Sequence, residues 1–149
     1  MIYLGSDHRG YEMKEKIKQW LKEQGREFED CGPDHFDKDD DYPDFCGKVG
    51  EKVSADPEQS FGIVLGYSGQ GEAIVANKSK HVRAIVYYGS KPEIVELGRL
   101  HNHANVLSLG AVFLSEQEAK AAIKTFLETK FLNEERHVRR VNKIKALES

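Results

Sequence analysis

The loop formed by residues 66–72, GYSGQGE, carries groups that can stabilise a negatively charged oxygen and accept a proton. Its glycines allow successive backbone N–H groups to turn inward as an anion-binding nest, and the Ser68 hydroxyl is a further donor. Glu72 stands at the rim of this nest, where a carboxylate can act as a base. Glycines after a strand also serve tight turns and nucleotide sites, and the helix dipole alone favours a glutamate in a first turn. The loop therefore indicates acid–base chemistry at an oxyanion without fixing the reaction.

A second polar loop, residues 5–10, follows the first apolar run and holds an acid, an imidazole and a guanidinium: Asp7, His8 and Arg9. These side chains stand where a helix is expected to begin, and the amino end of a helix attracts anions. The alternative interpretation is that Asp7 caps the helix and His8 is an ordinary surface histidine.

Residues 101–105, HNHAN, place two imidazoles and two amides just before an expected strand. Metal binding is one interpretation of His101 and His103. However, their spacing is that of a strand, and no neighbouring Cys or carboxylate completes a ligand set. We therefore expect no metal at this cluster.

Basic side chains begin the last segment of the chain, in the run RHVRR of residues 136–140. Arg136 and Arg140 are one helical turn apart, so both guanidinium groups project from one face and can grip a phosphate. Such a run is usually a solvated face, but the net charge of the chain is -3, so these cations are clustered and not generally abundant.

The composition limits the classes of function. A chain of 149 residues with a net charge of -3 is expected to form a single domain, residues 1–149, without a basic footprint for nucleic acid. Its apolar runs are strand-length, far short of a membrane span, and its start lacks the pattern of a signal peptide, so we expect a cytoplasmic protein. Cys31 and Cys46 are isolated, which favours neither a zinc site nor a disulfide scaffold.

Short apolar runs alternate with amphipathic segments along the chain, which is typical of βαβ units. Strands are expected at residues 2–4, 27–31, 62–65, 84–87 and 105–108. Helices are expected before Gly25, at residues 44–53, 73–76 and 134–147, and after two capping boxes, Ser90 with Glu93 and Ser115 with Glu118. The polar run 34–44 is expected to be a solvated surface loop. This order predicts an α/β fold with a parallel sheet covered on both faces and a site at the carboxyl ends of the strands.

Taken together, the motifs of the chain resemble the B-type ribose-5-phosphate isomerases and their galactose-6-phosphate and allose-6-phosphate isomerase relatives. The resemblance spans nearly the whole chain and rests on SDHRG at 6–10, DYP at 41–43, GYSGQGEAIVANK at 66–78, HN at 101–102 and RHVRRV at 136–141. It implies a Rossmann-like three-layer sandwich with a five-stranded parallel sheet and a C-terminal basic helix. It also implies no cofactor, and a homodimer or a dimer of dimers with sites at subunit boundaries.

The activity that the resemblance implies is aldose–ketose interconversion through a cis-enediolate. One branch of the family uses a cysteine base at the position that aligns with Gly66, whereas the branch that lacks this cysteine uses the glutamate, here Glu72. The implied roles of the other residues follow that assignment. Ser68 with Gly69, Gln70 and Gly71 stabilises the enediolate, His101 with Asp7 opens the sugar ring, Tyr42 and Asn102 hold hydroxyls, and His8, Arg136 and Arg140 grip the phosphate.

The chain departs from the family pattern at two positions. Many relatives carry an arginine after the Leu-Gly-Ala turn, where this chain has Val112. Arg9, where relatives commonly have a small residue, is hypothesised to replace it as a phosphate ligand. His103 stands where relatives often have Asp or Asn, which bears on the choice of sugar.

Ribose 5-phosphate and ribulose 5-phosphate are therefore the expected substrates, with three alternatives. A hexose 6-phosphate of the allose or galactose type would need the same chemistry on a longer sugar. A non-catalytic sugar-phosphate-binding subunit would need the phosphate grip but no base. A nucleotide-binding domain is the third alternative, although the first loop reads GSDHRG instead of GxGxxG.

Overall fold

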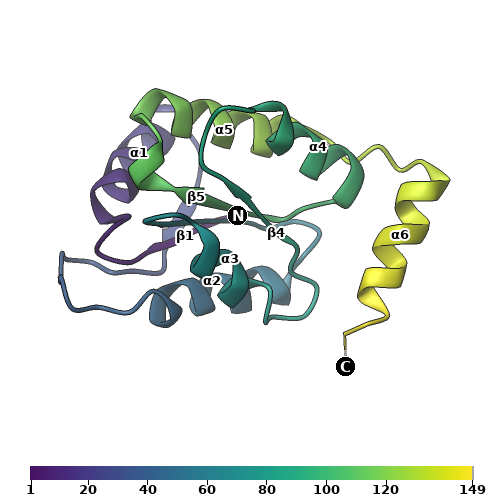
Figure 1. Cartoon of the computed structure of the whole chain (residues 1–149), viewed down its shortest axis with the longest axis horizontal. Coiled ribbons are helices and arrows are strands. Elements are labelled where there is room, and N and C mark those ends of the chain that lie inside the picture. The colour runs from purple at the N-terminus through teal and green to yellow at the C-terminus, as the bar shows by residue number, and fades with distance from the viewer. Residues whose placement is uncertain (149) are drawn as a thin grey trace.

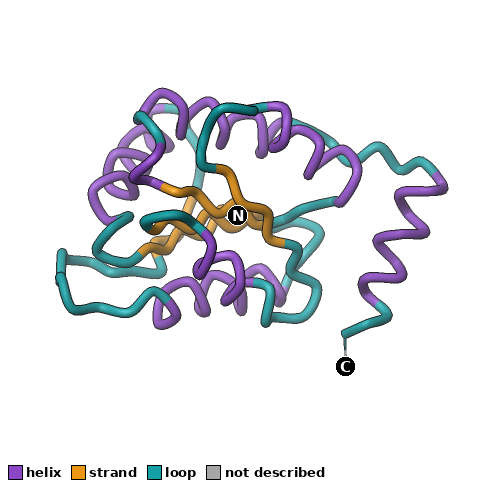
Figure 2. Tube along the Cα trace, in the orientation of Figure 1, coloured by secondary structure: helices purple, strands orange, loops and turns teal. Residues whose placement is uncertain are grey.

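The computed structural model describes residues 1–148, which form one five-stranded parallel sheet with helices on both faces (Figures 1 and 2). The sheet order is β2-β1-β3-β5-β4. The strands are β1 (Ile2–Ser6), β2 (Phe28–Asp30), β3 (Phe61–Gly66), β4 (Ala84–Tyr87) and β5 (Val106–Gly110). The predicted three-layer α/β fold is confirmed.

The helices divide between the two faces of the sheet. Helices α1 (Tyr11–Glu23), α4 (Glu93–Asn102) and α5 (Glu116–Glu128) cover one face, and α2 (Pro43–Ala55) and α3 (Gln70–Ala76) cover the other (Figure 1). The predicted basic helix, α6 (Glu135–Lys145), stands beside this sandwich and contacts α4. A single 3₁₀ turn, η1 (Ala111–Phe113), follows β5. No helix within residues 1–148 combines the length and the apolar character needed to cross a membrane.

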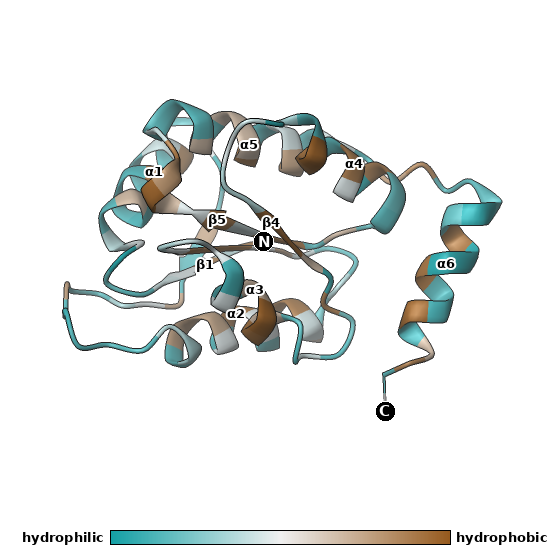
Figure 3. Ribbon diagram, viewed as in Figure 1, coloured by the Kyte–Doolittle hydropathy of each residue, from teal (hydrophilic) through white to brown (hydrophobic). Residues whose placement is uncertain are grey.

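Two apolar layers hold the sandwich together, one on each side of the sheet. In β3, Ile63 and Leu65 pack toward α1 and α5, whereas Val64 packs toward α2, because successive side chains of a strand point to opposite faces. All three are fully buried, as expected for a central parallel strand. Figure 3 shows the apolar colour along the strands, whereas the helices carry bands of apolar and polar colour.

The strand order brings the two predicted loops together at one edge of the sheet. β1 and β3 are neighbours, and the chain leaves them toward opposite sides of the sheet, which makes their carboxyl ends the switch point where ligands bind in such folds. The loop after β1 packs directly on β3: a Cβ atom at Gly10 would lie 2.3 Å from the Leu65 carbonyl oxygen. Only glycine permits this approach.

Three local predictions need correction. The capping box of Ser90 with Glu93 does not form, because Pro92 is the N-cap of α4 and Ser90 has a positive φ of 66°. The second box forms, with Ser115 and Glu118 exchanging hydrogen bonds of 3.1 and 3.2 Å. α3 begins at Gln70, not at residue 73. Residues 101–102 end α4 and are not strand-like, and His103 follows them in a left-handed conformation.

Candidate active site

Glu72 lies buried at the carboxyl edge of the sheet, in the first turn of α3. Its residue is 4% exposed, and a Cβ atom on Gly66 would lie 1.7 Å from its Oε1, so the carboxylate rests against the end of β3. Burial raises the pKa of Glu72 above the ordinary value of 4.5, a hydrogen bond from its own backbone lowers it in part, and the Asp7 carboxylate raises it further. Glu72 and Asp7 therefore share one electrostatic environment.

The glycine loop before α3 is clamped by the end of β5. The Ser108 hydroxyl donates to the Gly69 carbonyl oxygen at 2.6 Å, and Gly69 has a positive φ of 82°. A Cβ atom on Gly110 would lie 2.6 Å from the Ser68 carbonyl oxygen. Within the loop, Gln70 N–H donates to the Ser68 hydroxyl at 3.4 Å. The shape of the predicted nest is thus imposed by the neighbouring strand as well as by its own glycines.

Asp7 shapes the loop after β1. Its Oδ1 accepts hydrogen bonds from the backbone N–H groups of Arg9 at 2.8 Å and Gly10 at 3.1 Å, and the residue is 6% exposed. The N-cap of α1 is Gly10, and no side chain caps this helix. The interpretation of Asp7 as the helix cap is therefore wrong, since Asp7 closes the preceding turn instead.

His8 is held by a residue from the acidic loop. Asp40 Oδ1 accepts from the His8 backbone N–H at 2.9 Å and lies 2.7 Å from His8 Nδ1. The Asp40 side chain is 7% exposed. The prediction of a solvated surface loop is wrong at this residue, because one carboxylate of the run is drawn into the protein by an imidazole 32 positions earlier.

Arg9 and Tyr42 reach the same edge from different elements. The Arg9 guanidinium lies 5.2 Å from the centroid of the Tyr67 ring, and both side chains line a hollow of about 230 Å³ together with Val112. Tyr42 is the N-cap of α2, and its ring lies so close to Gly71 that a Cβ atom there would be 2.6 Å from a ring carbon. The structure thus gathers nine of the predicted site residues at this edge: Asp7, His8, Arg9, Tyr42, Ser68, Gly69, Gln70, Gly71 and Glu72.

The remaining four predicted residues lie far from the Glu72 edge of the sheet within the same chain. His101 and Asn102 end α4, immediately before β5 begins, and therefore stand at the amino ends of the strands. The His101 ring stacks on His137 of α6, with centroids 4.4 Å apart and planes 10° apart. Arg136 and Arg140 belong to α6, at the far end of the molecule from α1 (Figure 1). One chain alone does not bring these four residues to Glu72.

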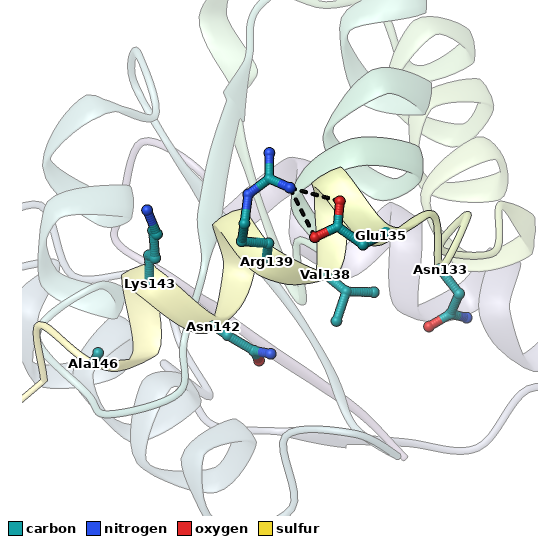
Figure 4. Close-up of a pocket in the computed structure, with 7 residues that line it drawn as sticks. All are labelled: Asn133, Glu135, Val138, Arg139, Asn142, Lys143 and Ala146. Carbon is teal, nitrogen blue, oxygen red and sulfur yellow. Dashed lines mark hydrogen bonds and ion pairs between the residues drawn. The ribbon is translucent and has the colours of Figure 1, made fainter.

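The outer face of α6 forms a separate shallow hollow. Figure 4 shows it lined by α6 and the preceding Asn133, with Arg139 turned toward Glu135. Arg139 Nη1 donates to Glu135 Oε1 at 2.7 Å and to Oε2 at 2.5 Å. This hollow contains none of the residues gathered around Glu72. Within residues 1–148, no three His, Cys, Asp or Glu side chains gather closely enough to hold a metal ion.

Comparison with known proteins identifies the family. The sequence profile described as Ribose/Galactose Isomerase matches residues 2–144. This chain belongs to the Ribose/Galactose Isomerase family. Ribose-5-phosphate isomerase B of Mycobacterium tuberculosis (strain ATCC 25618 / H37Rv) is 41% identical over 141 residues, which cover 95% of this chain and 85% of that protein.

Solved structures of the same family share the fold. Ribose-5-phosphate isomerase B from Mycoplasma genitalium, with bound ribulose-5-phosphate, superposes with a TM-score of 0.94 at 36% identity and covers 99% of this chain and 95% of its own. Ribose-5-phosphate isomerase B from Clostridium thermocellum gives a TM-score of 0.90 at 38% identity, covering 99% and 96%.

Two side chains of this family member were not singled out from the sequence. Asp40, which holds His8, is one of three consecutive acids, and nothing in such a run marks which member turns inward. His137, which stacks on His101, lies within the basic run, where its burial was not anticipated. Burial lowers the pKa of His137, and the neighbouring His101 and Arg136 lower it further, whereas Glu134 opposes this. The available signal in the sequence was the spacing of His137 and the apolar Val141, which are four residues apart and therefore lie on the same face of a helix. Both residues are buried in α6.

Proposed function

We propose that this chain interconverts ribose 5-phosphate and ribulose 5-phosphate by moving a proton between two adjacent carbons of the sugar. The observation that carries the proposal is the buried Glu72 carboxylate, whose pKa is raised by burial and which adjoins the glycine loop. A base for a carbon acid works best with a pKa closer to neutrality than that of an exposed glutamate. The name of the Mycobacterium relative and the ribulose-5-phosphate bound to the Mycoplasma relative support this choice of substrate.

In the proposed reaction, Glu72 takes the proton from C2 of the open-chain aldose and returns it to C1, while the proton of the C2 hydroxyl passes to the oxygen on C1, so that the carbonyl moves from C1 to C2. The intermediate is a cis-enediolate whose oxygen carries negative charge. The Ser68 hydroxyl and the backbone of Gly69, Gln70 and Gly71 are assigned to that oxygen, because preorganised donors stabilise charge as it develops. Residues 1–149 would form a single catalytic domain and would need no cofactor.

We further propose that the active site is completed between two copies of the chain, in a homodimer or a dimer of dimers. The separation of His101 from Glu72 within one chain supports this arrangement, since ring opening by His101 with Asp7 requires both at one substrate. Exposed apolar side chains also surround the Glu72 edge: Tyr67, Val112 and Phe113 are 48%, 52% and 55% exposed. Apolar patches of this kind favour an interface.

The phosphate of the substrate is assigned to His8 and Arg9 of one copy and to Arg136 and Arg140 of the other. Tyr42 and Asn102 are assigned to the sugar hydroxyls. A phosphate far from the reacting carbons can supply binding energy that positions them, which raises the rate of the chemical step. A cytoplasmic location is part of the proposal and agrees with the two cysteines, both of which are free.

The test is an assay of ribose 5-phosphate conversion by the purified, EDTA-treated protein, with allose 6-phosphate and galactose 6-phosphate as parallel substrates. Turnover of the pentose phosphate that is lost in Glu72→Gln would support both the reaction and the base. Turnover of a hexose phosphate alone would contradict the proposed substrate, but it would remain consistent with the proposed proton transfer by Glu72. Binding of sugar phosphates without any turnover would contradict the enzyme and favour a sugar-phosphate-binding subunit.

A further inference from the structure

His8 is held by a single carboxylate oxygen at two points. Asp40 Oδ1 accepts from the backbone N–H of His8 at 2.9 Å and lies 2.7 Å from Nδ1 of its ring. The contact joins the loop after β1 to the loop before α2, so the two loops constrain each other. When Nδ1 of an imidazole is engaged, Nε2 is the ring nitrogen left for a ligand.

Asp40 is buried in a way that its neighbours in the acidic run are not. Its side chain is 7% exposed, whereas that of Asp39 is 78% exposed. The second oxygen of Asp40, Oδ2, is also buried and has no hydrogen-bond partner among the described residues. Burial of a carboxylate in this condition is costly, so the contact with His8 is the compensation that the structure offers.

His8 also borders a hollow of about 480 Å³ beside the Glu72 edge. The lining side chains are those of His8, Arg9, Glu12, Phe36 and Lys38. Phe36 meets the His8 ring edge-on, with centroids 6.3 Å apart, and so limits its rotation from another side. Three basic side chains around one hollow favour an anionic ligand, and a phosphate monoester is the anion of the proposed substrate.

We infer that Asp40 is a positioning residue that holds the His8 ring with Nδ1–H as a donor to Oδ1, so that, with both ring nitrogens protonated, Nε2–H donates to the phosphate of the substrate. This inference rests on the proposed function for the identity of the ligand. It concerns the orientation of His8, and Asp40 itself does not touch the sugar phosphate.

The test compares Asp40→Ala and Asp40→Asn with Asp39→Ala, a matched control that removes an exposed acid from the same loop. The ring nitrogens of His8 are followed by ¹⁵N NMR, with His8→Gln used to assign the signals, and KM and kcat are measured with ribose 5-phosphate. In Asp40→Ala we expect loss of the Nδ1–H signature and a KM raised about tenfold, with kcat changed less than about twofold. Asp40→Asn retains an acceptor and should keep the Nδ1–H signature and a KM within about threefold of wild type. Asp39→Ala should change neither readout.

Two results would overturn the inference. The first is a wild-type His8 ring in the neutral Nε2–H tautomer, which needs no variant to observe. The second is an additional rise in KM when Asp40→Ala is placed on His8→Ala, because a residue that acts only through His8 has no effect once His8 is gone. If the wild-type protein turned over no sugar phosphate, the proposed function would fail, and the NMR comparison would still decide whether Asp40 holds His8.

Discussion

The Glu72 carboxylate occupies the space in which a side chain at Gly66 would begin. A Cβ atom on Gly66 would lie 1.7 Å from Oε1 and 2.1 Å from the carboxyl carbon of Glu72, closer than non-bonded atoms approach. Glycine at position 66 is therefore a condition for this placement of Glu72. A side chain at position 66 and the Glu72 carboxylate thus exclude each other at this point of the fold.

Substitution of Gly66 by alanine is expected to lower kcat about 100-fold, because displacement of a catalytic group by about 1 Å has an effect of this size. Gly47→Ala is the matched control, since its new Cβ would meet only Val75 Cγ1 at an ordinary 3.8 Å. The measurement is kcat for ribose 5-phosphate, with thermal unfolding to show that both variants are folded. Full activity of Gly66→Ala would contradict the role given to Glu72.

Removal of the Glu72 charge is expected to abolish turnover and to stabilise the protein at neutral pH. Burial raises the pKa of Glu72 above 4.5 in the folded protein. The protein therefore has its full stability below the unfolded pKa of this group, and it loses part of that stability as the pH rises through the folded pKa and Glu72 ionises. Glu72→Gln should therefore raise the free energy of unfolding at pH 7 and have a smaller effect near pH 4. Thermal unfolding at both pH values measures this difference.

The same shift predicts the acid limb of the activity. The rate of the wild-type enzyme should fall, on acidification, through a pKa above the ordinary 4.5 of a glutamate. Glu51→Gln, at an exposed position of α2, is the control and should leave both the stability and the acid limb unchanged. If the change in unfolding free energy caused by Glu72→Gln were less favourable at pH 7 than at pH 4, the raised pKa of Glu72 would be contradicted.

Arg9 is expected to contribute to phosphate binding in place of an arginine at position 112. Arg9 and Val112 line one hollow, so a guanidinium from either position can enter it. Arg9→Ala should raise KM about tenfold, since it removes a charge-assisted contact. Val112→Arg, added to Arg9→Ala, should restore most of the affinity. Lys22→Ala removes an exposed charge from α1 and serves as the control; an unchanged KM in Arg9→Ala would refute the idea.

Mixed oligomers test the proposal that two copies complete the site. Glu72→Gln and His101→Asn should each be inactive alone, because every site then lacks one group. When the two are unfolded and refolded together, a shared site predicts recovery of about one quarter of wild-type activity, since half of random dimers are hybrids with one intact site each. Glu72→Gln mixed with Ser68→Ala is the control, because both residues lie on one edge of the same chain and no intact site can form.

Local sequence was sufficient for the elements whose determinants are close together along the chain. The apolar residues of β3, the helical spacing of α1 and the Ser115–Glu118 box each depend on neighbours within about one or two turns, and the structure confirms them. The capping box predicted at Ser90 is absent because Pro92, two residues later, is the N-cap of α4. The identity of the candidate residues in the Glu72 loop and in the loop after β1 was likewise readable from residue types and spacing.

The sequence by itself determined the fold class, the chemistry available and the order of the motifs, because propensity, periodicity and capping are short-range properties. Only the tertiary structure decided that Asp40 turns inward to His8, that Glu72 rests on Gly66, and that His101 lies at the edge of the sheet opposite Glu72. These relationships depend on the direction in which each helix returns along the sheet and on the space left when the layers pack. Residues that are distant along the chain meet or separate according to that packing, which no local pattern records.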